Sequence, residues 1–427
     1  MIFRKASIYV AILGMGAALC APAAQAAVSV KAGKWDLSLS GNVNASYIYS
    51  HCASSTTAPA VAGGLACVAT GGSSSVSNGL LPAALDIGAS TVEKGYTIAF
   101  TFGLYPGIST NDGGSPNLGS VANDTLRHTA LGSAGLDIRQ VFMTISSKEY
   151  GTVLAGRNIG LFASDAILND MTLLGVGAGN GTYATPGNTS LGSIGLGYIY
   201  ADWLSQIDYT TPTVSGANLT VGIFDPLNIV GQQPVNHHSP GFQWKAAYTI
   251  GNLYLSASGL YQQQRVECTD TGILDVAACP LGSTSTNYLD YSSTAWDAGG
   301  KYAAGPFEVM GWYYRADGVG TTGLFLDSND LMGHPRRSEG YIAQVTYTVG
   351  ETKFGVNYGQ SKLDPTAFDR SLNSTLVENN NKWTLGIYHH LTPHLMILGE
   401  FSRIQSINDM NQKDSSWNID AGLFLSF

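Results

Sequence analysis

Residues 414–427 read "DSSWNIDAGLFLSF", and the chain ends there on the bare aromatic ring of Phe427. Side chains two residues apart lie on one face of an extended strand. The face that ends at Phe427 is apolar and carries Trp417, Ile419, Ala421, Leu423 and Leu425. The pattern therefore predicts a strand with one apolar face that runs to the final residue. An unpaired strand of this kind invites aggregation in water, which indicates that it is paired, covered or buried in something other than water.

The N-terminal residues predict export. Arg4 and Lys5 precede the apolar run "ASIYVAILGMGAALCA", and the following "AQAAV" offers small residues for cleavage. This order is typical of a secretory signal peptide, so we expect residues 1–26 to be removed and residues 27–427 to form the mature protein. An uncleaved membrane helix is the alternative, since the apolar run is nearly long enough to span a bilayer, but the cleavage site favours removal.

Composition narrows the class of protein. Removal of residues 1–26 takes away two cations and no acids, which changes the formal net charge from −9 to −11 and disfavours nucleic acid as a partner. The chain is 44% hydrophobic but only 12% charged, with 52 Gly and 22 Tyr. After the signal peptide no apolar run of about 18 residues occurs, so no spanning helix is expected. A weakly charged exported chain of this kind is typical of a transmembrane β-barrel, in which apolar residues occupy every second position.

Four cysteines remain after the signal peptide. Cys52 and Cys67 form one close pair in the sequence, and Cys268 and Cys279 form the other. In an exported chain such pairs predict two disulfides. The alternative is a metal site, but neither pair has the two-residue spacing or the clustered histidines of a zinc site, so no metal is expected.

The alternation of the last strand recurs throughout the mature chain. It predicts sixteen strands in total, and the alternation over residues 34–50 is far longer than an ordinary strand. The expected strands cover residues 34–50, 84–92, 96–105, 136–146, 151–157, 198–210, 218–225, 241–249, 252–263, 294–302, 307–315, 339–349, 352–361, 382–390, 394–404 and 414–427.

The connections between these strands alternate strictly between short turns and long loops. The long loops cover roughly residues 50–83, 106–135, 158–197, 226–240, 265–293, 316–337, 362–381 and 405–415. This alternation predicts an antiparallel barrel with turns at one end and loops at the other. A soluble sandwich is the alternative, but its polar second face would leave no dry core. A barrel of about sixteen strands leaves room for water inside.

The stretch "FMTISSKEYGTVLAGRNIGLFASDAILND" (142–170) combines a strand, a short turn, a second strand and the start of the longest loop. Here the chain resembles the general bacterial porin family, the trimeric sixteen-stranded diffusion channels of Gram-negative outer membranes. The resemblance covers nearly the whole mature chain. It implies a homotrimer in outer-membrane lipid with external loops and periplasmic turns. The last strand, with Trp417, Leu423, Leu425 and Phe427, matches the signal by which the family's barrel-assembly machinery recognises its substrates.

In porins the third long loop folds into the barrel and presents acidic side chains opposite basic residues of the wall. The resemblance thus implies a pore constriction that contains Asp165 and Asp170, although the chain lacks the Pro-Glu-Phe-Gly-Gly stretch of some members and ordinary loop solvation is the alternative. Parity, and the cost of ~2–4 kcal/mol for a charge facing lipid at mid-membrane, place four bases in the lumen. These are Arg139, Arg157, Lys245 and Lys301.

The expected function is passive diffusion of small ions and hydrophilic solutes through a water-filled channel, without a cofactor. A substrate-specific channel for a sugar, phosphate or organic anion is the main alternative, and an adhesin or an enzyme is a further one. The histidines that could suggest an enzyme have no serine elbow or acidic partner at a recognisable offset. They are His237, His238, His389 and His390. The glycine-rich "GVGAGNG" (175–181) is expected to be a flexible loop, because no phosphate-binding Lys-Ser or Lys-Thr follows it.

Ion selectivity follows from the charges that parity and the third loop place inside the barrel. The acids are Asp36, Asp86, Asp208, Asp297, Glu308, Glu400, Asp420, Asp165 and Asp170, and the bases are Arg139, Arg157, Lys245, Lys301, Lys353 and Lys382. Nine acids against six bases predict a weak preference for cations.

Overall fold

The computed structural model describes residues 28–54, 60–67, 71–108, 136–179, 189–229, 235–268, 287–330 and 332–427. The expected signal peptide (1–26) and Cys279 lie outside these residues, and so does the side chain of Cys268. The predictions for them therefore stay predictions.

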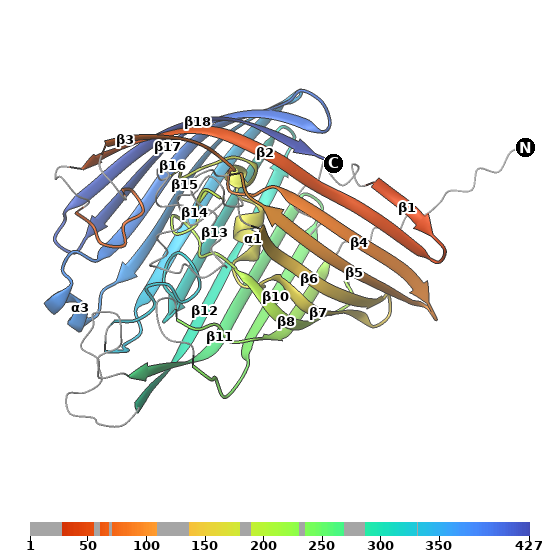
Figure 1. Ribbon diagram of the computed structural model, residues 1–427, viewed down its shortest axis with the longest axis horizontal. Helices are drawn as coiled ribbons and strands as arrows, with labels where there is room; N and C mark the ends of the chain where they lie inside the picture. Colours follow the sequence, from red (N-terminus) through yellow and green to blue (C-terminus); the bar gives the residue numbers. More distant parts are fainter. Residues whose placement is uncertain are drawn as a thin grey trace, which may run out of the picture.

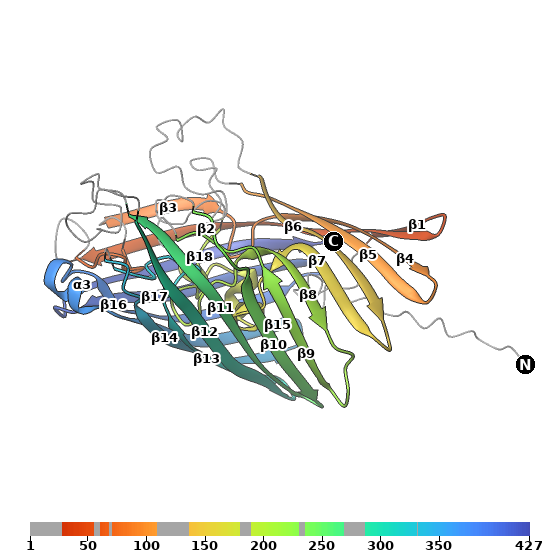
Figure 2. The same ribbon diagram turned by 90° about the horizontal axis from the view of Figure 1, so that it is seen from below.

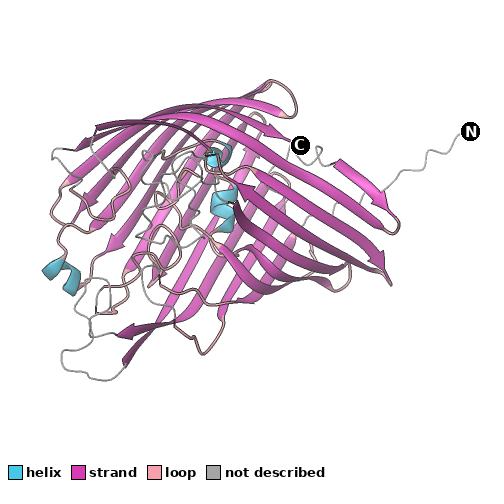
Figure 3. Ribbon diagram, viewed as in Figure 1, coloured by secondary structure: helices cyan, strands magenta, loops and turns pink. Residues whose placement is uncertain are grey.

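Within the described ranges, eighteen strands form one antiparallel sheet with little helix (Figures 1 and 3). The strands are β1 (Val28–Ala32), β2 (Trp35–Ser54), β3 (Gly71–Ser77), β4 (Ala84–Glu93), β5 (Tyr96–Pro106), β6 (Leu136–Ser147), β7 (Gly151–Ile159), β8 (Trp203–Thr210), β9 (Ala217–Phe224), β10 (Gly241–Ile250), β11 (Leu253–Cys268), β12 (Asn287–Ala304), β13 (Phe307–Asp317), β14 (Arg337–Val349), β15 (Thr352–Asp364), β16 (Val377–His390), β17 (Leu395–Asn408) and β18 (Lys413–Ser426). The helices are α1 (Ser164–Leu168), the 3₁₀ helix η3 (Met171–Leu174) and α3 (Ala367–Leu372). No helix in the described part of the chain is long and apolar enough to cross a membrane.

Sixteen of these strands close into a barrel, which confirms the predicted fold. Pairing runs from β2 through β4 to β18 in chain order, and β18 returns to β2. The other two strands pair with β2 near its ends: β1 pairs with Trp35–Leu39, and β3 with Ser46–Cys52. Strand β3 lies in a region expected to be a loop, and residues 198–202, expected to begin a strand, lie before β8 instead. The barrel has a short-turn end, where β1 and the C-terminus lie, and an opposite long-loop end that carries α3 (Figures 1 and 2).

The last residue closes the barrel. Gly41 N–H donates to Phe427 O at 2.8 Å, and Phe427 N–H donates to Gly41 O at 3.0 Å. A side chain at position 41 would place Cβ 2.1 Å from Ala84 O, so only glycine allows this close approach between strands. The chain end is thus a paired strand end, and its backbone leaves no open edge where β18 meets β2.

The two faces of the barrel differ as the alternation predicts. On β18, Leu423 and Leu425 are 53% and 42% exposed on the outer face. On the opposite face of the same strand, Asn418 and Asp420 are buried on the inner side of the barrel wall. An apolar outer face and a polar inner face suit a barrel that sits in lipid and encloses water.

A disulfide joins Cys52 of β2 to Cys67 across 15 residues, with a Cα–Cα distance of 5.6 Å. The prediction for this pair is confirmed. The disulfide holds residues 60–67 against the wall, where Val61 N–H donates to Asp414 and Ala66 N–H donates to Ser406. Residues 60–67 of the first long loop are therefore held against β17 and β18.

Deletion of Phe427 is expected to lower the yield of folded barrel, because the closing pair of backbone hydrogen bonds with Gly41 and the terminal ring are lost together. Each such bond contributes about 0.5–1.5 kcal/mol. The folded fraction can be measured by heat-modifiable migration of outer-membrane protein on gels. The control is Phe427→Tyr, which keeps the backbone pair and the ring and should fold as the parent does. An unchanged folded yield after the deletion would contradict the prediction.

Trypsin leaves each cysteine pair within one peptide, because no Lys or Arg lies between Cys52 and Cys67 or between Cys268 and Cys279. Alkylation without reductant is therefore expected to label none of the four thiols and to reveal no linked peptides. Free thiols at 268 and 279, or a link between the two peptides, would show that the second pairing is wrong.

Candidate functional site in the lumen

The third loop, residues 160–202, connects β7 to β8, and its described parts, residues 160–179 and 189–202, lie inside the barrel, where α1 is seen in Figures 1 and 3. Its first attachment is to β10 and β11. Lys245 Nζ lies 3.1 Å from Asp165 Oδ1 and 3.3 Å from Ser164 Oγ, and Tyr254 Oη donates to Asp165 Oδ2 at 2.6 Å. Burial alone would raise the pKa of the Asp165 carboxyl, but the Lys245 ammonium and the Tyr254 hydroxyl hold it below its usual value.

The second attachment is at Asp170, which begins η3. Its Oδ1 accepts from Thr172 N–H at 3.0 Å and from Asn357 Nδ2 at 3.1 Å, and its Oδ2 accepts from Tyr198 Oη at 2.8 Å. The carboxylate thus joins the outgoing part of the third loop (residues 160–179) to its returning part (residues 189–202) and to β15. Asp170 therefore acts as a helix cap and a structural link.

The third attachment reaches the opposite wall. Glu400 of β17 accepts hydrogen bonds from Val176 N–H at 2.9 Å and from Gly177 N–H at 2.6 Å, and also from the Tyr388 hydroxyl. A Cβ at Gly175 would lie 2.1 Å from Glu400 Oε1, so a larger residue there would displace the Glu400 carboxylate. Residues 175–179 are buried, and the expectation of a flexible glycine-rich loop is wrong for them.

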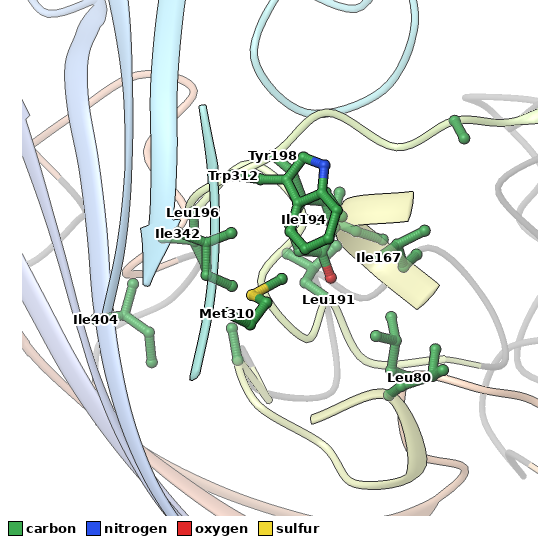
Figure 4. Packing of buried hydrophobic residues seen from close by; sticks show 14 of the residues in the cluster. Leu80, Ile167, Leu191, Ile194, Leu196, Tyr198, Met310, Trp312, Ile342 and Ile404 are labelled. Carbon is green, nitrogen blue, oxygen red and sulfur yellow. The ribbon is translucent and has the colours of Figure 1, made fainter. Parts of the chain in front are cut away.

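The returning part of the third loop forms an apolar core inside the barrel. Ile194, Leu196 and Tyr198 belong to one cluster of buried residues with Trp312 and Ile342 of the wall (Figure 4). Other long loops join this core by backbone hydrogen bonds: Leu80 N–H donates to Gly175 O at 2.7 Å, and Tyr200 N–H donates to Thr322 O at 2.7 Å. Loops that are far apart in sequence thus meet within the lumen.

Arg139 lies inside the barrel because of a β-bulge. The register between β5 and β6 shifts at Gly103, so that Arg139 and its neighbour Gln140 are both buried. The Arg139 guanidinium donates to Asp137 at 2.8 Å and lies 5.3 Å and 5.8 Å from the ring centroids of Tyr105 and Trp203. Arg139 therefore holds the start of β8 to the wall and carries no free charge into the lumen.

Arg157 does not line the lumen, and the prediction for it is wrong. Its register partners are Val141 on β6 and Ser205 on β8. Val141 is exposed on the outer face, whereas Asn158, the next residue, points inward and accepts a hydrogen bond from Gln140. The short sequence "GTVLAGR" gave too few polar positions to fix this parity.

A cavity of about 590 Å³ lies beneath the third loop at the short-turn end of the barrel. Residues 168–171 and 173–174 of the third loop line one side of it. Lys301, Glu308 and Lys353 line the wall, and none of the three forms an ion pair among the described residues. Lys301 is the one predicted constriction base with a side chain in this cavity. Glu308 and Lys353 were placed inward by parity, but nothing in the sequence distinguished them from the other inward charges.

Comparison with known proteins places these features in context. The sequence profile of the family described as Gram-negative porin matches residues 11–409. The outer membrane channel DcaP of Acinetobacter baumannii has a similar structure, with a TM-score of 0.65, 12% identity, and coverage of 94% of this chain and 100% of that one. OmpF of Salmonella typhi, solved in complex with daunomycin, gives a TM-score of 0.56 at 12% identity and the same coverage. OmpT, an outer membrane protein of Vibrio cholerae, gives 0.53 at 13% identity, again with the same coverage. These identities show a shared fold, and no curated protein matches the sequence.

Replacement of Glu400 by Gln is expected to loosen the tip of the third loop, because a neutral amide accepts hydrogen bonds from Val176 and Gly177 less strongly than a carboxylate does. Hydrogen bonds to charged groups contribute about 1.5–3 kcal/mol, so amide exchange at these positions should rise about tenfold or more. Hydrogen–deuterium exchange of a peptide that covers residues 171–179 measures this. Glu351→Gln is the control, because Glu351 is an exposed turn residue. Unchanged protection in Glu400→Gln would contradict the role of Glu400.

Proposed function

The chain belongs to the Gram-negative porin family and forms an outer-membrane channel, and we propose that small ions and hydrophilic solutes diffuse passively through its water-filled lumen with a weak preference for cations. The observation that carries this proposal is a closed sixteen-stranded barrel with an apolar outer face and a charged inner face. The family and the fold indicate a channel rather than an enzyme, and no catalytic step or cofactor enters the proposal.

The cation preference rests on the cavity beneath the third loop. Its lining carries the carboxylates of Asp170, Glu308 and Glu351 and the ammonium groups of Lys301 and Lys353. The lining thus has an excess of one negative charge, which favours cations, and charges more than about 8–10 Å from it are screened at physiological salt.

The charges that sequence parity places inside the barrel contribute unequally to the preference for cations. Asp165 is neutralised by Lys245, and Asp36 forms an exposed ion pair with Lys31 of β1 at the end of the barrel. The cavity therefore has more influence on selectivity than the full count of inward acids and bases.

A substrate-specific channel is the second candidate. It is favoured by the apolar core that the third loop forms with the wall at Trp312 and Ile342, since this core fills part of a lumen that sixteen strands would otherwise leave open. The two candidates differ in one observable. A specific channel is blocked by its own solute at low concentration, whereas a general one passes many solutes at rates that depend mainly on size.

The outer-membrane setting implies three further features. We expect residues 1–26 to be cleaved on export, and Phe427 to be recognised by the barrel-assembly machinery in addition to closing the sheet. A homotrimer is supported by Arg157, because a charge on the outer face of the barrel is costly against lipid and less costly against a neighbouring subunit. Native mass spectrometry in detergent should find three copies, and a monomer alone would argue against the trimer.

The zero-current potential across a planar bilayer under a KCl gradient tests the selectivity. The parent should favour K⁺ weakly, and Glu308→Gln should shift the potential toward Cl⁻ because it removes an unpaired carboxylate from the cavity. Asp36→Asn is the control, since Asp36 is exposed outside the cavity and should leave the potential unchanged. A parent that prefers chloride would refute the proposal. An unchanged potential in Glu308→Gln would remove this residue from the conduction path.

A further inference from the structure

The cavity beneath the third loop holds charges of both signs that the protein leaves without direct partners. Lys301, Lys353 and Glu308 line it, and no ion pair within 4.0 Å involves any of them in the described part of the chain. The Lys353 ammonium lies 4.8 Å from the centroid of the Tyr388 ring, and Tyr388 itself is fixed by its hydrogen bond to Glu400. A cation held over an aromatic face in this way keeps its position and still offers hydrogen-bond donors to the cavity.

Part of the remaining lining is apolar, beside polar and charged residues that include Asp170 and Glu351. Leu173 and Leu174 contribute from the third loop, and Met396 and Phe424 contribute from β17 and β18. Leu174 packs against the cluster that contains Met396 and Phe424, so this apolar wall is continuous from the loop to the barrel. The volume of the cavity, about 590 Å³, lies within the range of about 300–1,000 Å³ that small-molecule sites have.

These features restrict the chemistry of a solute that would bind there. A purely anionic solute would meet Glu308 as well as the lysines, and a purely cationic one would meet the two lysines. A neutral solute would leave the charges without partners while displacing their water. A zwitterion with a carboxylate and an ammonium satisfies both signs at once, and an aliphatic side chain suits the apolar wall.

We propose that this cavity is a binding site for small zwitterionic solutes of the amino-acid and short-peptide class. Lys301 and Lys353 bind the solute carboxylate, and Glu308 binds its ammonium group. The proposal rests on the proposed function, since the solute reaches the cavity through the channel. The cavity thus binds solutes selectively on the permeation path, in addition to narrowing that path.

Block of single-channel KCl current by the dipeptide glycyl-L-leucine tests the proposal. The dipeptide should reduce the current saturably. N-acetyl-glycyl-L-leucine, which lacks the ammonium, and glycyl-L-leucinamide, which lacks the carboxylate, should bind about tenfold more weakly, as expected for the loss of one hydrogen bond to a charged group. In a channel that conducts KCl, either of two results would overturn the proposal. One is equal block by all three compounds, and the other is no block by any of them. A folded protein that conducts no KCl would instead contradict the proposed function itself.

Variants separate the two halves of the site. Glu308→Gln should weaken the block by glycyl-L-leucine about tenfold and leave that by the N-acetyl compound unchanged or stronger. Lys353→Met should weaken the block by both compounds, and Lys301→Met provides the same test if Lys353→Met fails to fold. Lys148→Met is the control, because Lys148 is exposed in the turn between β6 and β7 and should leave every block unchanged. Variants at 308 and 353 that bind the dipeptide as the parent does would overturn the proposal.

Discussion

Every backbone N–H and C=O that faces hydrocarbon must find a partner within the protein, and this constraint shapes the whole molecule. A sheet satisfies it only when no edge remains, and here the pairing of β18 with β2 supplies the closure. The last residue takes part directly, since Phe427 exchanges both backbone hydrogen bonds with Gly41. Closure at sixteen strands then sets a diameter that the wall side chains cannot fill, and the long loops occupy the remaining space.

The third loop occupies that space by attachments at widely separated points of the wall. Asp165 is bound by Lys245 on β10, Asp170 by Asn357 on β15, and Val176 and Gly177 by Glu400 on β17. Each attachment uses a carboxylate, because a buried charge binds hydrogen-bond donors more strongly than a neutral group does. The charges that hold the loop are thereby neutralised or fully hydrogen-bonded. Lys301, Lys353 and Glu308, which form no ion pair among the described residues, lie in the cavity below it.

Strict alternation made the barrel predictable from the sequence, and all sixteen expected strands are present. It predicted side-chain direction less well where strands are short or irregular. Arg139 lies inward only because a bulge shifts the register, and Arg157 belongs to a strand with few polar positions to define its faces. Contacts between distant segments left no local pattern in the sequence from which they could be predicted. Glu400, for example, was one of several acids expected on the inner face, and only the fold shows that it contacts Gly175 and Gly177.

The third loop, held across the lumen, is expected to limit what the channel conducts. Ile159 and Trp203 are register partners at its two ends, so a short glycine–serine linker can replace residues 162–199 without separating β7 from β8. Single-channel conductance in KCl, measured for this variant and for the parent, tests this role of the loop. We expect a several-fold higher conductance from a variant barrel that remains folded. The same conductance with and without the loop would contradict it.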